Sequence, residues 1–584
     1  MRKINYLVGF VGLMCFTSTV VSAQGFLRAR NQEIVNDNGN VLLRGIGLGG
    51  WVLQEPYMLQ LSGIARTQTE IRSKINELAG DSATRVFYEE WIKNGITRAD
   101  LDSLSAWGFN SVRYPMHYNL FTLPVEDEPV PGENTWLEEG FVLTDSLLSW
   151  CAANRIYLML DLHAAPGGQG NDIAISDASE VRLWESEENK NKTVALWRKL
   201  AERYAGEEWI GGYDVLNEPN YGFESKDDKN GCAEPLNAPL RELLIRITEA
   251  IREVDRNHLI VIEGNCWGNN YNGIFPLWDD NIVISFHKYW NYNYEGELHF
   301  ILKHREQNNA PIWLSESGEN SNAWFTDAIR MMEEKNIGWC WWTYKRMGLA
   351  CPMQVQKPEG YDALKQYWAG TGERPSQEQA VKVLSQLAEN YKLKNTVFHK
   401  DYLDALFRQV RTDETLPYTT HELKSGSSLT VFASDYDLGR SGWAYHDTDS
   451  ANYRTSTSVS VPWNSGESYR NDGVDIAPCN DFPTNGYCVS YTEPGEWLQY
   501  TIDVEKEGKY LLSLRTSHAA EGGRLHLTVN GEPAGDVTVP DGSAGEWTLS
   551  AGRETALKKG QNTLRVFIDK GGFDLNYIRL ATER

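Results

Sequence analysis

Tyr213-Asp-Val-Leu-Asn-Glu-Pro219 is a short run of strand-forming residues that ends in polar side chains. Similar short apolar or β-branched runs recur along the first 345 residues. Between them lie longer stretches with apolar residues at every third or fourth position, which is typical of helices. The eight runs span residues 43–49, 111–114, 157–162, 212–216, 259–263, 282–286, 312–315 and 338–343. Strands that alternate with helices indicate a parallel sheet, and eight such units close a barrel, so we predict an α/β fold of the (β/α)8 TIM-barrel type.

The N-terminal segment has the order of a cleavable secretory signal. Met-Arg-Lys is followed by a mostly apolar run over residues 6–21 and then by Val21-Ser-Ala23. A charged start, a short apolar run and small residues before a cleavage point are the parts of such a signal. We therefore predict a signal peptide at 1–23 and a secreted or periplasmic protein.

The C-terminal part changes character. Helical periodicity ends with residues 376–391, and residues 416–428 are polar and carry turn formers without a period. From 429 onward short alternating runs are punctuated by Gly, Asn and Pro, which is typical of an all-β sandwich. We predict a barrel domain over 24–415, a linker over 416–428 and a jelly-roll-like β-sandwich over 429–584, with each domain able to fold alone.

Composition narrows the class of partner. The net charge of −24 argues against nucleic acid or an anionic membrane, because both need a basic surface. No segment after residue 23 approaches about 20 uninterrupted apolar residues, so we predict no membrane insertion. The chain carries 21 Trp and 28 Tyr, whose flat faces suit stacking on sugar rings or an aromatic core. A neutral polysaccharide or oligosaccharide fits best, and the sequence does not fix the oligomeric state.

The cysteines point to disulfides rather than to metal. No CxxC or Cys/His cluster has zinc spacing, and we predict no metal and no cofactor. Loss of residues 1–23 leaves seven cysteines. Cys151, on an apolar helix face, is expected to be a buried free thiol. The pairings that we consider are Cys232 with Cys266, Cys340 with Cys351, and Cys479 with Cys488.

Several predicted strands end in polar residues, and those ends of a barrel open on the active-site face. The strand-end residues are Arg113, His163, Asn217, Glu218, Glu263, His287, Tyr289 and Glu316. Glycoside hydrolysis needs two carboxyl groups that flank the scissile bond, one protonated and one ionised. Glu218 and Glu316 follow the fourth and seventh strands, which lie far enough across a barrel mouth to supply such a pair. A positive charge from Arg113 would favour the ionised form of Glu316.

These motifs resemble glycoside hydrolase family 5. Tyr213–Pro219 looks like that family's Asn-Glu-Pro strand, and Ile312-Trp-Leu-Ser-Glu-Ser-Gly318 resembles its nucleophile strand. Four further motifs fall in the family's order over about 320 residues. They are Gly108-Phe-Asn-Ser-Val-Arg-Tyr-Pro115, Asp161-Leu-His163, His287-Lys-Tyr289 and Trp341-Trp-Thr-Tyr344.

The resemblance implies a role for each matching residue. Glu218 would be the general acid/base and Glu316 the nucleophile, with Asn217 bonded to the substrate's 2-hydroxyl. Arg113 and Tyr289 would position Glu316. His163 and His287 would line the cleavage subsite, and Trp342 would form its floor. The chain departs from the family in having Ser315 and Ser317 around the nucleophile. Glu319 therefore stays an alternative nucleophile, and Glu263 is expected to contact substrate or to pair structurally.

The sandwich resembles carbohydrate-binding module family 6. The similarity lies in three stretches, residues 469–475, 485–500 and 571–578. It implies that Tyr491 and Trp547 clamp a sugar, with Asn576 as a polar contact; the alternative is that these rings pack in the core. The family's calcium ligands would fall at Phe432 and Ser434, which lack carboxylates, so that site is expected to be weak.

The sequence thus predicts a secreted retaining β-glycoside hydrolase for β-linked glucans or related β-glucosides. A non-catalytic glycan-binding protein on an inactive barrel is the alternative, and it requires that Glu218 and Glu316 not share an open cleft. An enzyme for another β-glycan, such as mannan or xyloglucan, also stays open, as does endo or exo action.

Overall fold

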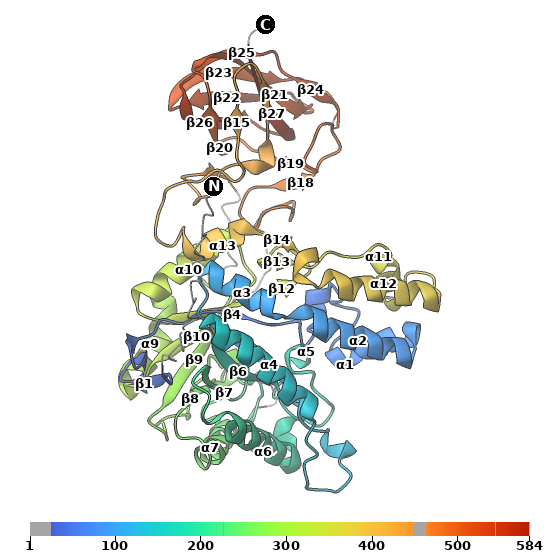
Figure 1. Cartoon of the computed structure of the whole chain (residues 1–584), viewed down its shortest axis with the longest axis vertical. Coiled ribbons are helices and arrows are strands. Elements are labelled where there is room, and N and C mark those ends of the chain that lie inside the picture. The colour runs from blue at the N-terminus through green and yellow to red at the C-terminus, as the bar shows by residue number, and fades with distance from the viewer. Residues whose placement is uncertain (1–24, 226, 449–462, 544, 583–584) are drawn as a thin grey trace, which may run out of the picture.

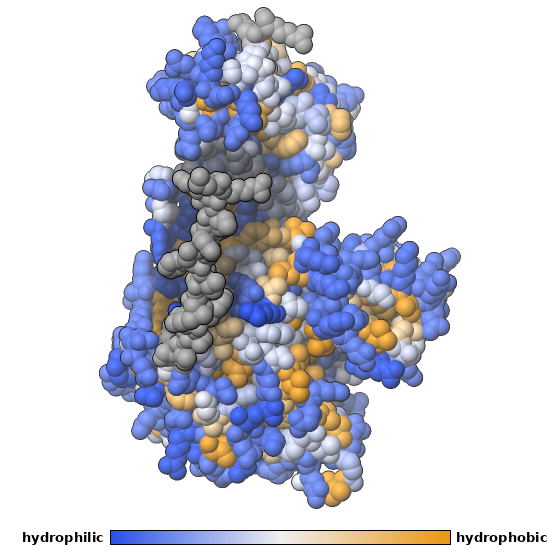
Figure 2. Space-filling model, in the orientation of Figure 1, coloured by the Kyte–Doolittle hydropathy of each residue, from blue (hydrophilic) through white to orange (hydrophobic). Residues whose placement is uncertain are grey.

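The computed structural model describes residues 25–225, 227–448, 463–543 and 545–582. The predicted signal peptide lies outside these residues. The molecule is elongated, with the barrel at one end and the sandwich at the other (Figure 1). Hydrophilic residues dominate the face of both lobes in Figure 2, in keeping with the acidic composition. Among the described residues, no helix is long and apolar enough to cross a bilayer.

Eight parallel strands close the barrel in the order β10-β11-β4-β5-β6-β7-β8-β9, which confirms the predicted fold. The strands are β4 (Arg44–Gly47), β5 (Ser111–His117), β6 (Tyr157–Ala164), β7 (Ile210–Asp214), β8 (Leu259–Ile262), β9 (Ile282–Lys288), β10 (Ile312–Gly318) and β11 (Gly338–Trp342). Nearly all of their residues are buried, because side chains fill the barrel on one face and helices cover the other. This double burial explains why the strands read as continuous apolar runs.

Helices surround the barrel and extend it on one side. The main helices between the strands are α3 (Arg98–Trp107), α4 (Glu138–Asn154), α6 (Glu187–Tyr204), α7 (Ala238–Arg252), α9 (His299–Asn308) and α10 (Asn322–Glu334). The chain adds α1 (Gln68–Ala79) and α2 (Asp81–Gly95) after β4, and α11 (Tyr361–Trp368), α12 (Gln377–Asn390) and α13 (Lys400–Phe407) after β11. Helix α12 packs on α1 and α2, so these elements form a lateral extension (Figure 1).

Small elements complete the barrel domain. An N-terminal sheet contains β1 (Arg28–Arg30), β2 (Glu33–Asn36) and β3 (Gly39–Asn40), and a second contains β12 (Lys345–Arg346), β13 (Met353–Gln354) and β14 (Val397–Phe398). Two one-turn helices, α5 (Ile173–Ser176) and α8 (Asn265–Gly268), lie in the loops that follow β6 and β8. Those loops border the carboxyl ends of the strands, where the site is built.

The C-terminal region is a two-sheet sandwich with its own apolar core. One sheet contains β15 (Glu422–Leu423), β17 (Tyr445–His446), β20 (Trp497–Val504), β22 (Gly523–Val529), β23 (Glu532–Val539) and β26 (Gly560–Lys570). The other contains β16 (Ser428–Phe432), β18 (Ile476–Pro478), β19 (Tyr487–Val489), β21 (Gly508–Ser517), β24 (Trp547–Leu549), β25 (Arg553–Leu557) and β27 (Leu575–Thr582).

The segment 416–428 differs from the linker that its composition predicts. Strand β15 lies inside it and pairs with β20, and Leu423 is buried in the sandwich core. Leu416 forms a β-bridge with Leu438. Only Tyr418, His421 and Leu423 of this segment are buried, so its composition resembles that of a free connector.

The disulfide predictions are partly correct. Cys232 and Cys266 are bonded, with 4.7 Å between their Cα atoms, and Cys151 is a buried free thiol as expected. The other two pairings are wrong in this structure, since Cys340, Cys351, Cys479 and Cys488 are free. Cys340 is fixed on barrel strand β11, whereas the thiol of Cys351 donates to the carbonyls of Arg346 and Gly348.

Candidate active site

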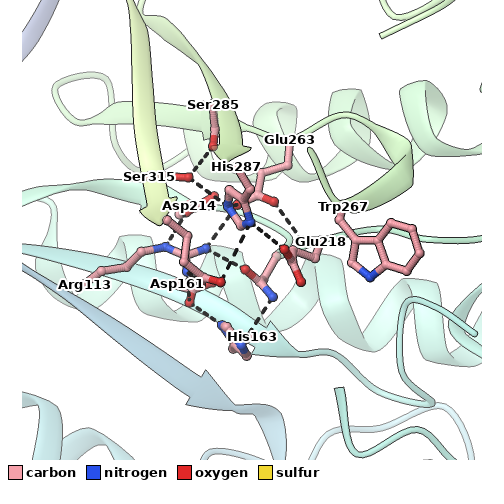
Figure 3. A network of polar contacts seen from close by, with 12 residues as sticks. Arg113, Asp161, His163, Asp214, Glu218, Glu263, Trp267, Ser285, His287 and Ser315 are labelled. Carbon is pink, nitrogen blue, oxygen red and sulfur yellow. Dashed lines mark hydrogen bonds and ion pairs between the residues drawn. The ribbon is translucent and has the colours of Figure 1, made fainter. Parts of the chain in front are cut away.

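The two predicted acids meet in one open cleft. Glu218 follows β7 and Glu316 lies on β10, and both line a cavity of about 1090 Å³ at the carboxyl ends of the barrel strands. One oxygen of each carboxylate and a ring nitrogen of His287 lie within 4.8 Å of one another. Figure 3 shows Glu218 facing His287 within a dense polar network. A non-catalytic barrel would not place both acids in one open cleft, so this arrangement argues against that alternative.

A local irregularity of β10 turns Glu316 toward the cleft. The pairing of β10 with β9 shifts register between Leu314 and Glu316. Such bulges re-aim side chains next to active sites. The carboxylate accepts hydrogen bonds from Arg113 Nη1 at 2.5 Å and from the Tyr289 hydroxyl at 2.7 Å. Two donors, one on β5 and one directly after β9, therefore fix its orientation.

Glu218 has a different environment. Its residue adopts a left-handed backbone conformation with φ of +43°, and its N–H donates to Glu263 Oε2 at 2.7 Å. The carboxyl contacts His287 Nδ1 at 2.6 Å. Burial raises the pKa of Glu218 to about 7, and the hydrogen bond from His287 only partly opposes that shift. The two carboxyls thus have different surroundings, since Glu316 accepts from Arg113 and Tyr289 whereas Glu218 faces His287.

His287 is held in its charged form by the surrounding acids. Burial lowers the pKa of His287, but the carboxylates of Glu263, Glu316 and Glu218 outweigh burial and raise that pKa well above its usual value. Its Nε2 lies 3.0 Å from Ser315 Oγ, which in turn contacts Ser285. Ser315, a departure from the family pattern, is therefore part of the histidine's support.

Arg113 is the buried centre of the network. Four carboxylates surround its guanidinium, at 3.1 Å for Asp161, 2.8 Å for Asp214, 3.0 Å for Glu263 and 2.5 Å for Glu316. Burial raises the pKa of Asp161 and Asp214 well above their usual values, although Arg113 opposes the shift. Glu263 thus pairs structurally, as predicted. Asp161 and Asp214 stand within the motifs Asp161–His163 and Tyr213–Pro219, but no role was predicted for either.

Asn217 and His163 are ordered by the same network. Arg113 Nη2 donates to Asn217 Oδ1 at 2.8 Å, and Asn217 Nδ2 lies 3.3 Å from His163 Nε2. His163 Nδ1 contacts Asp161 at 2.8 Å. Burial lowers the pKa of His163 to about 3, so this imidazole is neutral. Both residues therefore present fixed polar atoms near the two acids.

Trp342 forms one wall of the cleft. Its ring stacks on His163 with 5.1 Å between centroids and an angle of 3°, and its Nε1 donates to the Tyr57 hydroxyl at 2.7 Å. A Cβ on Gly49 would come within 2.5 Å of the Trp342 ring, so this position requires glycine. The Trp342 ring thus lies in the cleft, where the family resemblance places it.

Glu319, the alternative nucleophile, forms an ion pair beside the cleft. Its carboxylate pairs with Arg346 Nη1 at 2.7 Å, and the Arg346 guanidinium lies 5.0 Å from the centre of the Tyr57 ring. Tyr57 and Glu55 also line the cleft, and neither was predicted from the sequence. Burial and the nearby carboxylates raise the pKa of Glu55 well above its usual value. Tyr57 and Glu55 lie in the loop after the first barrel strand, and this position could have indicated that they line the cleft.

Trp267 enters the cleft from the loop after β8 (Figure 3). Cys266 and Trp267 both adopt left-handed backbone conformations, with φ of 54° and 53°. The bond from Cys266 to Cys232 ties this loop to the one that follows β7. The disulfide thereby restrains the backbone that presents the Trp267 ring to a substrate.

The predicted module residues separate into two groups. Tyr491 is 59% exposed, and Trp547 is half-buried with its Nε1 donating to Asn480 at 2.9 Å. Neither ring belongs to the sandwich core. Asn576, in contrast, is fully buried, and its amide donates to Asp481 and to the Pro483 carbonyl. Asn576 therefore lies below the surface on which a sugar contact was expected, because it stabilises the 481–483 turn.

Comparison with known proteins identifies the barrel. Residues 68–348 match the family model for cellulase, glycosyl hydrolase family 5. The barrel is a family 5 glycosyl hydrolase domain. Residues 470–580 match carbohydrate binding module family 35, so the expected family 6 is wrong. The stretches that carried the resemblance largely cover strands β19, β20 and β27 and their turns, which are features of a sandwich and do not separate one module family from another.

Relatives of this family 5 domain include several glycosidases. A β-xylosidase of Phanerodontia chrysosporium is 29% identical over 45% of this chain and 52% of its own length. Endoglucanase C of Acetivibrio thermocellus is 25% identical over 54% of this chain and 94% of its own. A probable glucan 1,3-β-glucosidase A of Aspergillus clavatus is 26% identical over 48% and 63%. The chain thus spans about half the length of one curated relative and nearly all of another.

Solved structures of endoglucanase Cel5A from Thermotoga maritima also align with the chain. One is 17% identical and covers 50% of this chain and 90% of its own, with a TM-score of 0.35. Another, in complex with cellobiose, is 17% identical and covers 59% and 97%, with a TM-score of 0.38.

Proposed function

We propose that this protein is a retaining β-glycoside hydrolase that acts on β-linked glucans, with Glu316 as nucleophile and Glu218 as general acid/base. The separation of the two carboxyls carries the proposal. Retaining enzymes hold these groups about 5 to 5.5 Å apart, whereas inverting enzymes need roughly 6.5 to 9.5 Å to admit a water molecule. The oxygens of Glu218 and Glu316 that lie within 4.8 Å of each other favour retention.

The first chemical step breaks the glycosidic bond. An oxygen of Glu316 attacks the anomeric carbon, and the proton of Glu218 passes to the departing glycosidic oxygen. Arg113 and Tyr289 hold the attacking carboxylate by their hydrogen bonds. The products are a glycosyl ester on Glu316, a free alcohol and an ionised Glu218.

The second step releases the sugar. Ionised Glu218 takes a proton from water, whose oxygen attacks the anomeric carbon and breaks the ester to Glu316. Positively charged His287, 2.6 Å from Glu218, stabilises the carboxylate during this step. The two inversions at the anomeric carbon together retain its configuration.

Hydrolysis of matched β-1,3-, β-1,4- and β-1,6-linked gluco-oligosaccharides, with manno- and xylo-oligosaccharides alongside, tests the substrate class. We expect gluco-oligosaccharides to be cleaved fastest, with the first product a β-anomer by proton NMR. Faster cleavage of the manno or xylo series would overturn the substrate class, and a first-formed α-anomer would overturn the mechanism. Product lengths over time would also distinguish endo from exo action.

The pKa of Glu218 predicts the alkaline side of the pH profile. The first step needs protonated Glu218, and a pKa raised to about 7 keeps it protonated below that pH. We therefore expect kcat/KM to fall as pH rises through about 7, by roughly tenfold for each further pH unit. In Glu218→Gln, assayed with an activated aryl β-glucoside, this fall should vanish. Its persistence in the variant would assign the titration to another group.

We also propose that the sandwich binds glycan through Tyr491 and Trp547. One ring is well exposed and the other half-buried, and both stand outside the core. Trp547→Ala in the full chain should weaken retention on insoluble β-glucan about tenfold, because loss of an aromatic anchor costs about 1 to 2 kcal/mol. Trp443, 52% exposed in the turn before β17, gives a matched control, and Trp443→Ala should bind normally. Equal retention by the two variants would reject the assignment.

A further inference from the structure

One residue of the sandwich is buried against the barrel. Asn471 is 1% exposed, and its carbonyl accepts a hydrogen bond from the Asn322 N–H at 2.7 Å. The Asn471 N–H donates to Asp401 Oδ2 at 3.0 Å. Its side-chain Nδ2 donates to the Asn320 carbonyl at 2.9 Å and to Asn322 Oδ1 at 3.1 Å. Asn471 thus bonds the barrel through both its backbone and its amide.

The neighbours of Asn471 anchor it in the sandwich. The Arg470 guanidinium lies 3.6 Å from the centre of the Tyr436 ring and forms an ion pair with Asp472 at 3.0 Å. The Asp472 carbonyl accepts from Asn464 Nδ2 at 2.9 Å. Buried charges need such partners, and together these contacts make the turn rigid. Asn471 is therefore presented to the barrel at a defined position.

The barrel residue that Asn471 contacts leads to the nucleophile. Asn320 follows the end of β10 and is fully buried. Its Nδ2 donates to the Tyr289 carbonyl at 3.1 Å, and the Tyr289 hydroxyl donates to Glu316 at 2.7 Å. Three hydrogen bonds thus connect Asn471 of the sandwich with the nucleophile, through Asn320 and Tyr289.

We propose that Asn471 is a positioning residue for hydrolysis, and that the sandwich supports the catalytic site from behind in addition to binding glycan. The inference rests on the proposed roles of Glu316 and Tyr289. Loss of the Asn471 amide leaves the Asn320 carbonyl unpaired in a buried place, so the segment after β10 must shift to recover a partner. A displacement of about 1 Å near the reacting atoms can cost as much as about 100-fold in rate.

The test uses the full chain and an activated aryl β-glucoside, a substrate too small to span the two domains. We expect Asn471→Ala to lower kcat about tenfold with little change in KM, since Tyr289 acts on the nucleophile rather than on binding. Arg440→Ala is the control. Arg440 also joins the sandwich to α10, through Asp327 at 3.0 Å, but this half-buried pair lies outside the hydrogen-bond chain from Asn471 to Glu316, and its loss should leave kcat at the wild-type value.

A double-mutant cycle separates positioning from general destabilisation. If Asn471 acts through Tyr289, Asn471→Ala combined with Tyr289→Phe should lower kcat no further than Tyr289→Phe alone. Asn320→Asp is a second variant, which keeps the oxygen that caps Ser321 but loses the donor to Tyr289, and it should reproduce the loss even if Asn471→Ala fails to fold.

Three outcomes would reject the inference. They are wild-type kcat in folded Asn471→Ala, wild-type kcat in Asn320→Asp, and losses that multiply in the double mutant. If the wild-type protein hydrolyses neither an aryl β-glycoside nor the oligosaccharide panel, the proposed function itself is wrong, and this inference falls with it. Thermal unfolding of each variant verifies that the protein compared is folded.

Discussion

Glu316→Ala is expected to lower kcat by about 10⁴-fold or more, and added azide should restore part of the lost activity. The variant retains Arg113, Tyr289 and protonated Glu218, so leaving-group protonation survives while the attacking atom is missing. Azide is small enough to enter the space that the carboxylate vacates. Because only one displacement then occurs, a β-glucoside should give the α-glucosyl azide, which NMR identifies.

Glu319→Ala is the matched control for the nucleophile. Glu319 lines the same cleft and lies three residues on, but its carboxylate is engaged by Arg346 at 2.7 Å. Its loss should disturb Tyr57 and, through it, Trp342, which raises KM more than it lowers kcat. Azide should not rescue this variant. Formation of an α-glucosyl azide by Glu319→Ala, and not by Glu316→Ala, would move the nucleophile to position 319.

The barrel could be predicted because each of its strands is buried on both faces. A run such as 259–262 is apolar from end to end, and its boundary is marked by a polar residue, Glu263. The same boundary places catalytic candidates, since side chains at strand ends reach the cleft. Strand pattern therefore predicts the fold and the strand-end residues of the site, but not the lining residues that loops contribute, such as Tyr57 and Trp267.

The junction between the domains could not be predicted in this way. Asn320, Asn322, Asp401 and Asn471 are polar residues with no periodic pattern, and they are buried only because two distant segments meet. Local sequence indicates which residues can form a strand. It does not indicate that the amide of Asn471 donates to the carbonyl of Asn320, which is 151 residues away. A polar stretch before the sandwich suggested an independent module, whereas contacts of single residues join it to the barrel.

The contacts that surround His287, the neighbour of Glu218, could not be predicted from the sequence either. His287 was expected to line the subsite, but its charge results from three carboxylates contributed by different strands and loops. Ser315 was noted as a departure from the family pattern, and its hydroxyl lies 3.0 Å from His287 Nε2. Such a network depends on register shifts and side-chain directions that a one-dimensional pattern does not carry.

Glu218→Ala should distinguish the acid/base from the nucleophile through its dependence on the leaving group. For an unactivated oligosaccharide we expect kcat/KM to fall by about 10²- to 10⁴-fold, because the departing alkoxide needs a proton. For an aryl glucoside whose phenol is already acidic, the first step should be nearly unaffected. The second step then becomes limiting, since no base activates the water, and a burst of phenol should precede slow turnover.

Added azide gives the Glu218→Ala variant a second, independent readout. In Glu218→Ala the glycosyl ester on Glu316 still forms, and azide can attack it without help from a base. Two displacements then occur, so the product should be the β-glucosyl azide, opposite to that from Glu316→Ala. Equal losses on activated and unactivated substrates, with no β-azide, would remove Glu218 from the acid/base role. The opposite anomers expected from two variants of one cleft follow from the different surroundings of the two carboxyls: Glu316 is held by Arg113 and Tyr289, whereas burial keeps Glu218 protonated up to a pKa of about 7.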